Sequence, residues 1–200
     1  KYMFPLLALL SVSWSGRVSA DVLPAVLDFN NAKAWPIDQG LMLQGDALTG
    51  HAGRSVSSNL NSNGLGEIFI GDYAASSLGR TGCGEVSGFY GTSKLLSLSN
   101  PVNASAIRDF VVVGGESGDN AGYVITSLGD VTGDKRSDFL VTTYTASPLN
   151  RMGAGAFYVL RGGNLSGVID LRNLTVTQGI KFIGAAAGDA TGISAVGLKD

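Results

Sequence analysis

A glycine-punctuated segment of this chain occurs twice at a fixed distance, and this repetition constrains the fold more than any other feature. Residues 111–122 have glycines at 114, 118 and 122, and residues 181–192 have them at 184, 188 and 192. Asp119 recurs as Asp189 at the same spacing of 70 residues, which we call the repeat offset. A weaker copy covers residues 43–53. The period indicates a repeat architecture in which each repeat is one supersecondary unit.

The pattern within each repeat is β rather than α. Runs rich in Val, Ile, Phe and Tyr are bounded by Gly, Ser, Asn and Asp, and no long segment has a helical period. The 29 glycines favour many tight turns. Helical turns are expected around 28–34 and 168–174. Strands are predicted at 41–44, 55–58, 67–71, 85–90, 110–113, 123–128, 138–143, 156–160, 180–183 and 193–198.

Four short strands in each repeat, joined by short links, predict an antiparallel sheet. Such sheets repeated in tandem are typical of the blades of a β-propeller. We therefore expect an all-β chain with full repeats at about 40–109 and 110–179 and the start of a third at 180–200. Because an open arc of blades leaves sheet edges unpaired, we expect the chain to be part of a longer array.

The strongest candidate site is the loop from Asp130 to Asp138, which precedes the apolar run 139–141. Its alternating oxygen-bearing residues would let a tight loop surround a hard cation, and Ca²⁺ takes six to eight oxygen ligands. The alternative is an Asp-rich turn without metal, because Asp also favours turns by capping its own backbone. The predicted ligands are the side chains of Asp130, Thr132, Asp134 and Asp138 and the backbone carbonyl of Arg136.

A related loop lies about one repeat earlier, before the apolar run 68–70. Of its candidate oxygen donors only Glu67 is charged, and calcium affinity falls with the number of charged ligands. We predict weak or absent metal binding there, with the asparagines stabilising the turn through backbone hydrogen bonds. The aligned positions are Asn59, Asn61, Asn63 and Glu67.

These motifs together resemble the FG-GAP repeat, the blade unit of the integrin alpha-subunit β-propeller. They lie in residues 129–141 and 155–162, with an earlier copy in 67–71 and 85–91, and the resemblance covers about residues 40 to 200. This chain departs from the family's Gly-Ala-Pro after the apolar run. It has Gly71-Asp72-Tyr73 in one repeat and Thr143-Tyr144-Thr145 in the next.

The resemblance implies an extracellular calcium-binding β-propeller module for cell adhesion, or for binding a protein or glycan partner. The alternative is that these blades are non-catalytic parts of a secreted hydrolase or lyase whose catalytic domain lies outside this chain. We expect no enzymatic activity from the chain itself, because one His, one Cys and no Gly-x-Ser-x-Gly motif offer no catalytic constellation. Asp119 and Asp189 are interpreted as turn formers, Cys83 as a small turn residue, and His51 as a residue without a functional role.

The N-terminal segment 1–20 has the pattern of a secretory signal peptide. Lys1 precedes the apolar segment 3–10, and the small-x-small pattern ending at Ala20 predicts that the mature chain runs from Asp21 to 200. The apolar segment is shorter than the ~20 residues of a membrane span and is interrupted by Pro5, so a membrane anchor is disfavoured.

Secretion to the extracellular space agrees with three N-glycosylation motifs, at Asn103, Asn164 and Asn173. The net charge of −2, with scattered basic residues, excludes the electrostatic pattern of a nucleic-acid-binding protein. The aromatic residues in the predicted strands are expected in the core between blades rather than on a ligand platform. They are Phe89, Tyr90, Phe157, Tyr158 and Phe182.

Overall fold

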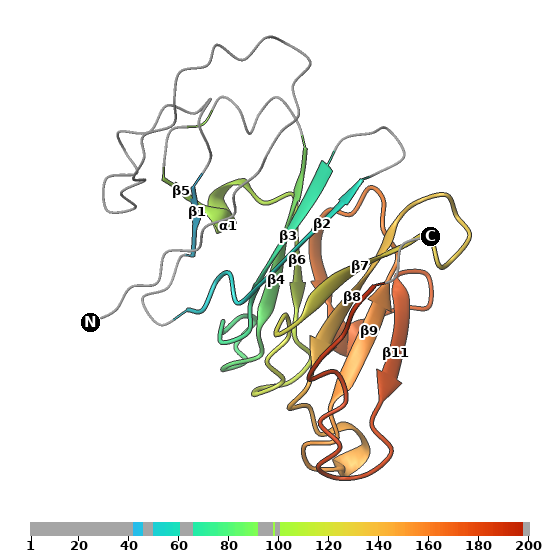
Figure 1. Ribbon diagram of the computed structural model, residues 1–200. Coiled ribbons are helices and arrows are strands. Elements are labelled where there is room, and N and C mark those ends of the chain that lie inside the picture. The colour runs from blue at the N-terminus through green and yellow to red at the C-terminus, as the bar shows by residue number, and fades with distance from the viewer. Residues whose placement is uncertain (1–41, 46–49, 61–65, 92–97, 99–100, 198–200) are drawn as a thin grey trace, which may run out of the picture.

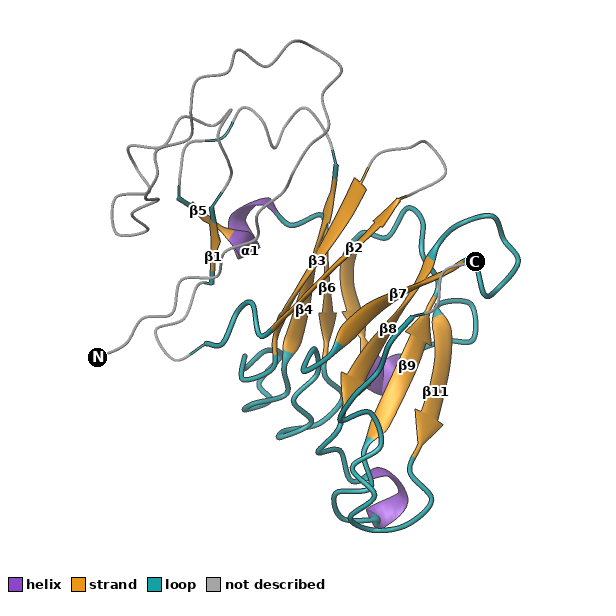
Figure 2. Cartoon of the chain, in the orientation of Figure 1, coloured by secondary structure: helices purple, strands orange, loops and turns teal. Residues whose placement is uncertain are grey.

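The computed structural model describes residues 42–45, 50–60, 66–91, 98 and 101–197 (Figure 1). The predicted signal peptide, the predicted turn at 28–34 and Asp200 lie outside these residues. The described part of the chain is all-β, as expected: two larger sheets stand beside each other with a few short helical turns, and neither sheet closes on itself (Figure 2).

The first sheet has five strands in the order β10-β6-β4-β3-β2. Four of them form an antiparallel sheet from consecutive β-rich segments, whereas β10 joins β6 in parallel, with Gly167 opposite Phe110. The bounds are β2 Ser55–Leu60, β3 Gly66–Asp72, β4 Glu85–Tyr90, β6 Phe110–Val113 and β10 Gly167–Asp170.

The second sheet has four antiparallel strands in the order β11-β9-β8-β7. Each of them starts about one repeat offset after its counterpart in the first sheet, so the sequence period is also a structural period. Each sheet takes its fourth strand, β6 or β11, from the beginning of the next sequence repeat. The bounds are β7 Ile125–Gly129, β8 Asp138–Thr143, β9 Ala156–Leu160 and β11 Gly179–Ile183.

The glycine-rich turns that follow β6 and β11 have matching hydrogen bonds. The carboxylate of Asp119 accepts the N–H of Glu116 at 2.9 Å, and that of Asp189 accepts the N–H of Ala186 at 2.7 Å. Both aspartates therefore cap their own turns, which confirms their interpretation as turn formers. Burial raises the pKa of Asp119 above its ordinary value.

The main hydrophobic core lies between the two sheets. Phe69 and Phe110 of the first sheet pack with Phe139 and Tyr158 of the second, and all four side chains are buried. The rings of Phe69 and Phe139 stack with centroids 4.6 Å apart. Because complete burial of one such side chain contributes about 1.5–3 kcal/mol, this layer holds the repeats together.

The other face of the first sheet is covered as well. Ile68, Ile70 and Phe89 pack against a short parallel strand pair and a single helical turn. These elements are β1 (Leu43–Gln44), β5 (Val102–Asn103) and α1 (Ala104–Ile107), and Leu43 is opposite Val102. The predicted strand near residue 43 thus exists, but it belongs to neither of the larger sheets.

One sequence-based assignment of secondary structure is right only in part, and one is wrong. The segment 168–174, expected to form a helical turn, contains a 3₁₀ turn at Leu171–Asn173 (η5), but its first residues belong to β10, which was not predicted. The described part of 193–198 is not a strand, although the N–H of Gly197 donates to Thr126 Oγ1 at 2.9 Å and so places the segment beside β7. A second 3₁₀ turn, Pro148–Asn150 (η4), lies between β8 and β9.

The aromatic residues expected in the core divide between two environments. Phe89 and Tyr158 are completely buried, and Tyr90 packs at the margin of the main core. Phe157 is half-buried and stacks at 4.7 Å on Phe182, whose side chain is 45% exposed. The expectation that Phe182 lies in the core is therefore wrong, because no described element covers β11 on its outer side.

Candidate functional site

The predicted metal loop joins β7 to β8 and stands at one end of the second sheet (Figure 1). Gly133 and Lys135 have φ values of 76° and 65°, so the loop turns tightly through two residues in the left-handed region. Glycine adopts this region without strain, whereas a lysine there needs compensating contacts. The acidic side chains of the loop provide such contacts.

Asp130 caps the loop from its first position. Its Oδ1 accepts the N–H groups of Gly133 at 2.7 Å and Asp134 at 3.0 Å, and its Oδ2 accepts the N–H of Lys135 at 2.7 Å. These three bonds hold the left-handed residues in place. They occupy three of the roughly four lone-pair positions that a carboxylate offers.

Asp138, the first residue of β8, is completely buried and links the loop to the next strand. Its Oδ2 accepts the N–H groups of Val131 and Thr132 at 3.0 and 2.9 Å. Its Oδ1 accepts the N–H of Gly162 at 3.1 Å and the hydroxyl of Thr132 at 3.4 Å. Four donors thus occupy all of the roughly four acceptor positions of this carboxylate.

Asp134 is bound less completely than the other two acidic residues. Its Oδ1 accepts the N–H of Arg136 at 2.9 Å, and its Oδ2 lies 4.0 Å from Nη1 of Arg161. An ion pair of this length on the surface contributes little stability. Asp134 is therefore the acidic residue of the loop with the most remaining capacity to accept another ligand.

The oxygen donors here are of the kind that calcium prefers, and the predicted ligand residues lie on the β7–β8 loop and, for Asp138, on the first residue of β8. Among the described residues, however, no three His, Cys, Asp or Glu side chains form a group that could hold a metal ion. The observed hydrogen bonds are those of a self-capped Asp-rich turn, the alternative that the sequence left open. Calcium binding by Asp130, Thr132, Asp134, Arg136 and Asp138 stays a prediction.

The earlier loop is described only at its two ends. Asn61 and Asn63 lie outside the described residues, while Asn59 and Glu67 are opposite each other in the β2–β3 pair. Glu67 is buried, and it occupies the position of Asp138 one repeat earlier. The prediction of weak metal binding there stays a prediction.

The three glycosylation motifs are accessible. Asn103 ends β5, Asn164 follows β9, and Asn173 ends η5, and the side chains of all three are exposed. Exposure is a requirement for modification of the asparagine amide, so the positions remain suitable for it.

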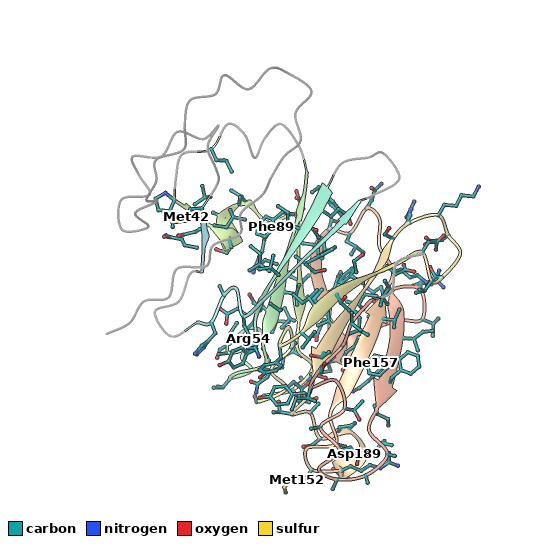
Figure 3. All side chains as sticks on the ribbon, in the orientation of Figure 1. Met42, Arg54, Phe89, Met152, Phe157 and Asp189 are labelled. Atoms are coloured by element: carbon teal, nitrogen blue, oxygen red, sulfur yellow. The ribbon has the colours of Figure 1, made fainter. Side chains whose placement is uncertain are left out.

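An aromatic surface that the sequence reasoning missed lies at the opposite end of the strands, after β3 and β8. We call Tyr73, Tyr123 and Tyr144, with His51 and Arg54, the tyrosine cluster. The ring of Tyr123 lies 5.5 Å from that of Tyr73 and 4.3 Å from that of Tyr144. The Arg54 guanidinium is 4.2 Å from the Tyr123 ring centroid, and the His51 ring is 4.8 Å from that of Tyr73. Arg54 is labelled in Figure 3.

A signal for this cluster was present in the sequence. Tyr73 and Tyr144 both occur where the chain departs from the Gly-Ala-Pro pattern, and each is the first residue after its strand, β3 or β8, so they are equivalent positions of the two repeats. The two departures therefore place the same side chain at corresponding points of the two sheets. The three tyrosine side chains are half-buried, and His51 and Arg54 are exposed.

Cys83 is buried and unpaired in the turn before β4. Its Sγ lies 3.7 Å from the carbonyl oxygens of Ala75 and Ser77. Burial raises the pKa of the thiol, which disfavours the reactive thiolate. Cys83 is thus a structural residue of the turn.

No family model matches this chain, and no curated protein matches it at a significant level. The FG-GAP resemblance consequently depends on the motifs and their spacing alone. Within the described part of the chain, no helix has the length and apolar character needed to cross a membrane.

Proposed function

We propose that this chain is an extracellular, calcium-supported β-propeller module of the FG-GAP type that binds a protein or glycan partner in adhesion. The observation that carries the proposal is the agreement of the sequence period with a period in strands, turns and hydrogen bonds. Repetition at this level is expected of blades and is uncommon in a single sandwich of unrelated strands.

The packing of the sheets supports the propeller. The first sheet has an apolar layer on both faces, one shared with the second sheet and one with β1, β5 and α1. A blade inside a propeller has a neighbour on each side in the same way. In this proposal β1 and β5 belong to the edge of a preceding blade, and the second sheet continues toward a following one.

Calcium would bind to the oxygens of the loop between β7 and β8. Its positive charge would offset the repulsion among three nearby carboxylates and would fix the turn at the edge of the blade. Asp138 is already saturated by hydrogen bonds, so calcium affinity is expected to depend most on Asp130 and Asp134.

The tyrosine cluster is the surface that we assign to partner binding. Tyrosine rings present a flat apolar face together with a hydroxyl group, which suits contacts with sugar rings and with protein side chains. Tyr and Arg are also the residue types enriched at the energetic centre of protein interfaces. The cluster lies at the opposite end of the strands from the calcium loop, so one ion can stabilise the blade without occupying the binding surface.

Calorimetric titration of the chelator-treated chain with Ca²⁺ tests the metal assignment. We expect a saturable binding event in the wild type that is lost in Asp134→Ala and is retained in Glu116→Gln, which removes an exposed carboxylate elsewhere. Equal calcium binding by the Asp134→Ala variant, or none by the wild type, would show that the loop is a metal-free turn.

Adhesion of cells to a surface coated with the chain tests the binding role. We expect attachment that falls in Tyr144→Ala and Tyr73→Ala, with circular dichroism spectra unchanged. The matched control is Val168→Ala, which shortens an exposed apolar side chain away from the cluster. Attachment that is equal for all the variants would contradict the assignment of the tyrosine cluster.

A further inference from the structure

The outer edge of the second sheet exposes an apolar strand. β11 is the last strand in its sheet, and the side chains of Ile180, Phe182 and Ile183 are 55%, 45% and 37% exposed. The strand lies beside β9, whose Phe157 stacks on Phe182 (Figure 3). An exposed edge with apolar side chains can pair with a further strand.

The equivalent strand of the first sheet shows what covers such an edge. β6 corresponds to β11 at the repeat offset, yet its side chains are at most 4% exposed. Its free edge is occupied by β10, which runs parallel to it and buries Ile169. β10 comes from the segment between β9 and β11, so it reaches back from the second repeat to the first sheet.

An ion pair fixes the end of β10. Arg80 has a side chain only 6% exposed, and its Nη1 donates to Asp170 at 2.8 Å and to the carbonyl of Gly115 at 2.8 Å. Asp170 is the last residue of β10, opposite Val113. The pair thus sets both the position and the direction of the added strand.

The second repeat has the equivalent arginine, Arg151, but no acidic partner for it among the described residues. Arg151 is the counterpart of Arg80 in the second repeat, and its Nη1 donates at 3.0 Å to the carbonyl of Gly184, which is one position earlier in the turn than the equivalent of Gly115. Within the described residues, no carboxylate forms a salt bridge with Arg151. The site next to β11 therefore has one half of the charge pair.

The strand pair β1–β5 is another example of a parallel strand added from later in the chain. Leu43 is opposite Val102 in this pair, and Phe110 is opposite Gly167 in the pair of β6 with β10. In both cases a short strand from almost one repeat further along the chain pairs in parallel with an earlier strand. The arrangement is thus a recurring property of this chain and not an accident at β6.

We propose that the outer edge of β11 is a docking site for an extended polypeptide segment that adds as a parallel strand and presents an aspartate to Arg151. The segment has the character of β10: an apolar residue at the position of Ile169 and an acidic one at that of Asp170. Backbone hydrogen bonds supply affinity in such strand addition, and the side chains supply selectivity. The proposal does not depend on calcium or on closure of a propeller.

The turn beyond β11 also indicates that the docked segment needs no basic residue after its aspartate. In the first sheet Glu116 forms an ion pair at 2.6 Å with Arg172, just after β10. The corresponding residue of the second repeat is Ala186, which cannot form this pair. A basic residue after the aspartate should consequently contribute nothing at β11.

A labelled synthetic peptide with the sequence of residues 164–174 is the probe, titrated against the whole chain and followed by fluorescence anisotropy. We expect saturable binding that weakens about tenfold or more when the peptide aspartate is replaced by Asn, as expected for loss of a hydrogen bond between charged groups. Replacing the peptide arginine by Ala should leave binding unchanged. Because these changes are made in the peptide, folding of the chain is not affected.

Two measurements on the chain locate the site. Arg151→Gln should weaken binding by the same factor, whereas Arg161→Gln, the same charge loss at the other end of β9, should not. Hydrogen exchange should slow at 180–183 and not at 110–113. Absence of saturable binding, equal binding of the Asn peptide, or protection at 110–113 would overturn the proposal. Concentration-dependent dimers with β11 protected would also overturn it, because the edge would then pair with another copy.

Discussion

Asp138→Ala tests whether this residue stabilises the fold directly or only through a bound ion. The carboxylate is completely buried and accepts the N–H groups of Val131, Thr132 and Gly162. In the variant, Gly162 keeps a buried N–H without an acceptor, whereas Val131 is exposed and its neighbour is half-buried, so water can reach their N–H groups.

The loss of unfolding free energy in this variant can be calculated from the hydrogen bonds that it removes. The buried N–H of Gly162 loses a charge-assisted bond, worth about 1.5–3 kcal/mol. The N–H groups of Val131 and Thr132 exchange the carboxylate for water and lose about 0.5–1 kcal/mol each. We expect Asp138→Ala to lower the free energy of unfolding by about 3–4 kcal/mol. Asp130→Ala, whose three bonds are all exposed to water, should lower it by less, about 1.5–3 kcal/mol at the same cost for each bond.

The assay is urea unfolding followed by fluorescence, carried out in chelator so that metal does not contribute. Asp138→Asn is the matched variant, because the amide keeps one acceptor oxygen and should recover part of the loss. If all three acidic residues of the loop act only as calcium ligands, their alanine variants should unfold alike in chelator. An Asp138→Ala variant no less stable than Asp130→Ala would refute the reasoning.

Two further changes test the packing of the repeats. Burial alone would raise the pKa of Asp170, but the hydrogen bond from Arg80 holds this pKa below its ordinary value. The ionised carboxylate therefore stabilises the fold at a pH above the ordinary pKa. This stabilisation is lost as the pH falls through the lower pKa of the folded state. Asp170→Asn should cost roughly 2 kcal/mol at neutral pH and nothing in strong acid, as measured by unfolding across pH, and a pH-independent difference would contradict the ion pair. Gly71→Ala should cost up to about 3 kcal/mol in thermal unfolding, because its Cβ would collide with the carbonyl oxygen of Gly122. Gly115→Ala, with 3.3 Å to Asp119 Oδ2, should cost less, and equal costs would contradict the close approach at Gly71.

The sequence predicted those parts of the fold that depend on local pattern. The strands at 85–90, 110–113, 138–143 and 156–160 have the bounds expected from apolar runs between turn residues. These strands pair with neighbours along the chain, so local signals are sufficient to place them. The fixed repeat offset likewise predicted that Asp119 and Asp189 have the same role.

The strand β10 could not be predicted in this way. It is short, only its Ile169 is buried, and it pairs with β6 from the preceding repeat. Its stabilising partner, Arg80, is far away in the sequence, before β4. Nothing in the local sequence contains these contacts, so the pattern predicts only the helical turn that follows β10, which is η5.

In the candidate loop, too, the local pattern predicted the turn but not the contacts with residues distant in the sequence. The alternation of oxygen-bearing residues predicted a tight turn, and the turn exists. From the spacing alone Asp130 and Asp138 are equivalent ligands. In the structure, however, Asp138 also accepts the N–H of Gly162 from beyond β9, and its carboxylate is saturated with hydrogen bonds. That difference depends on how β8 and β9 pair, which the spacing of acidic residues does not encode.

The return of β10 onto the first sheet separates three kinds of unit that are usually treated as one. The sequence repeat, the sheet and the piece of chain that supplies all the contacts of that sheet have different limits here. A fragment ending between the two sheets, at 114–124, would contain all four antiparallel strands of the first sheet but not Ile169 or Asp170. It would leave the guanidinium of Arg80 without its carboxylate and β6 without cover. A duplication or exchange of these repeats by recombination is therefore expected to preserve the contacts of the first sheet only where the cut falls after β10.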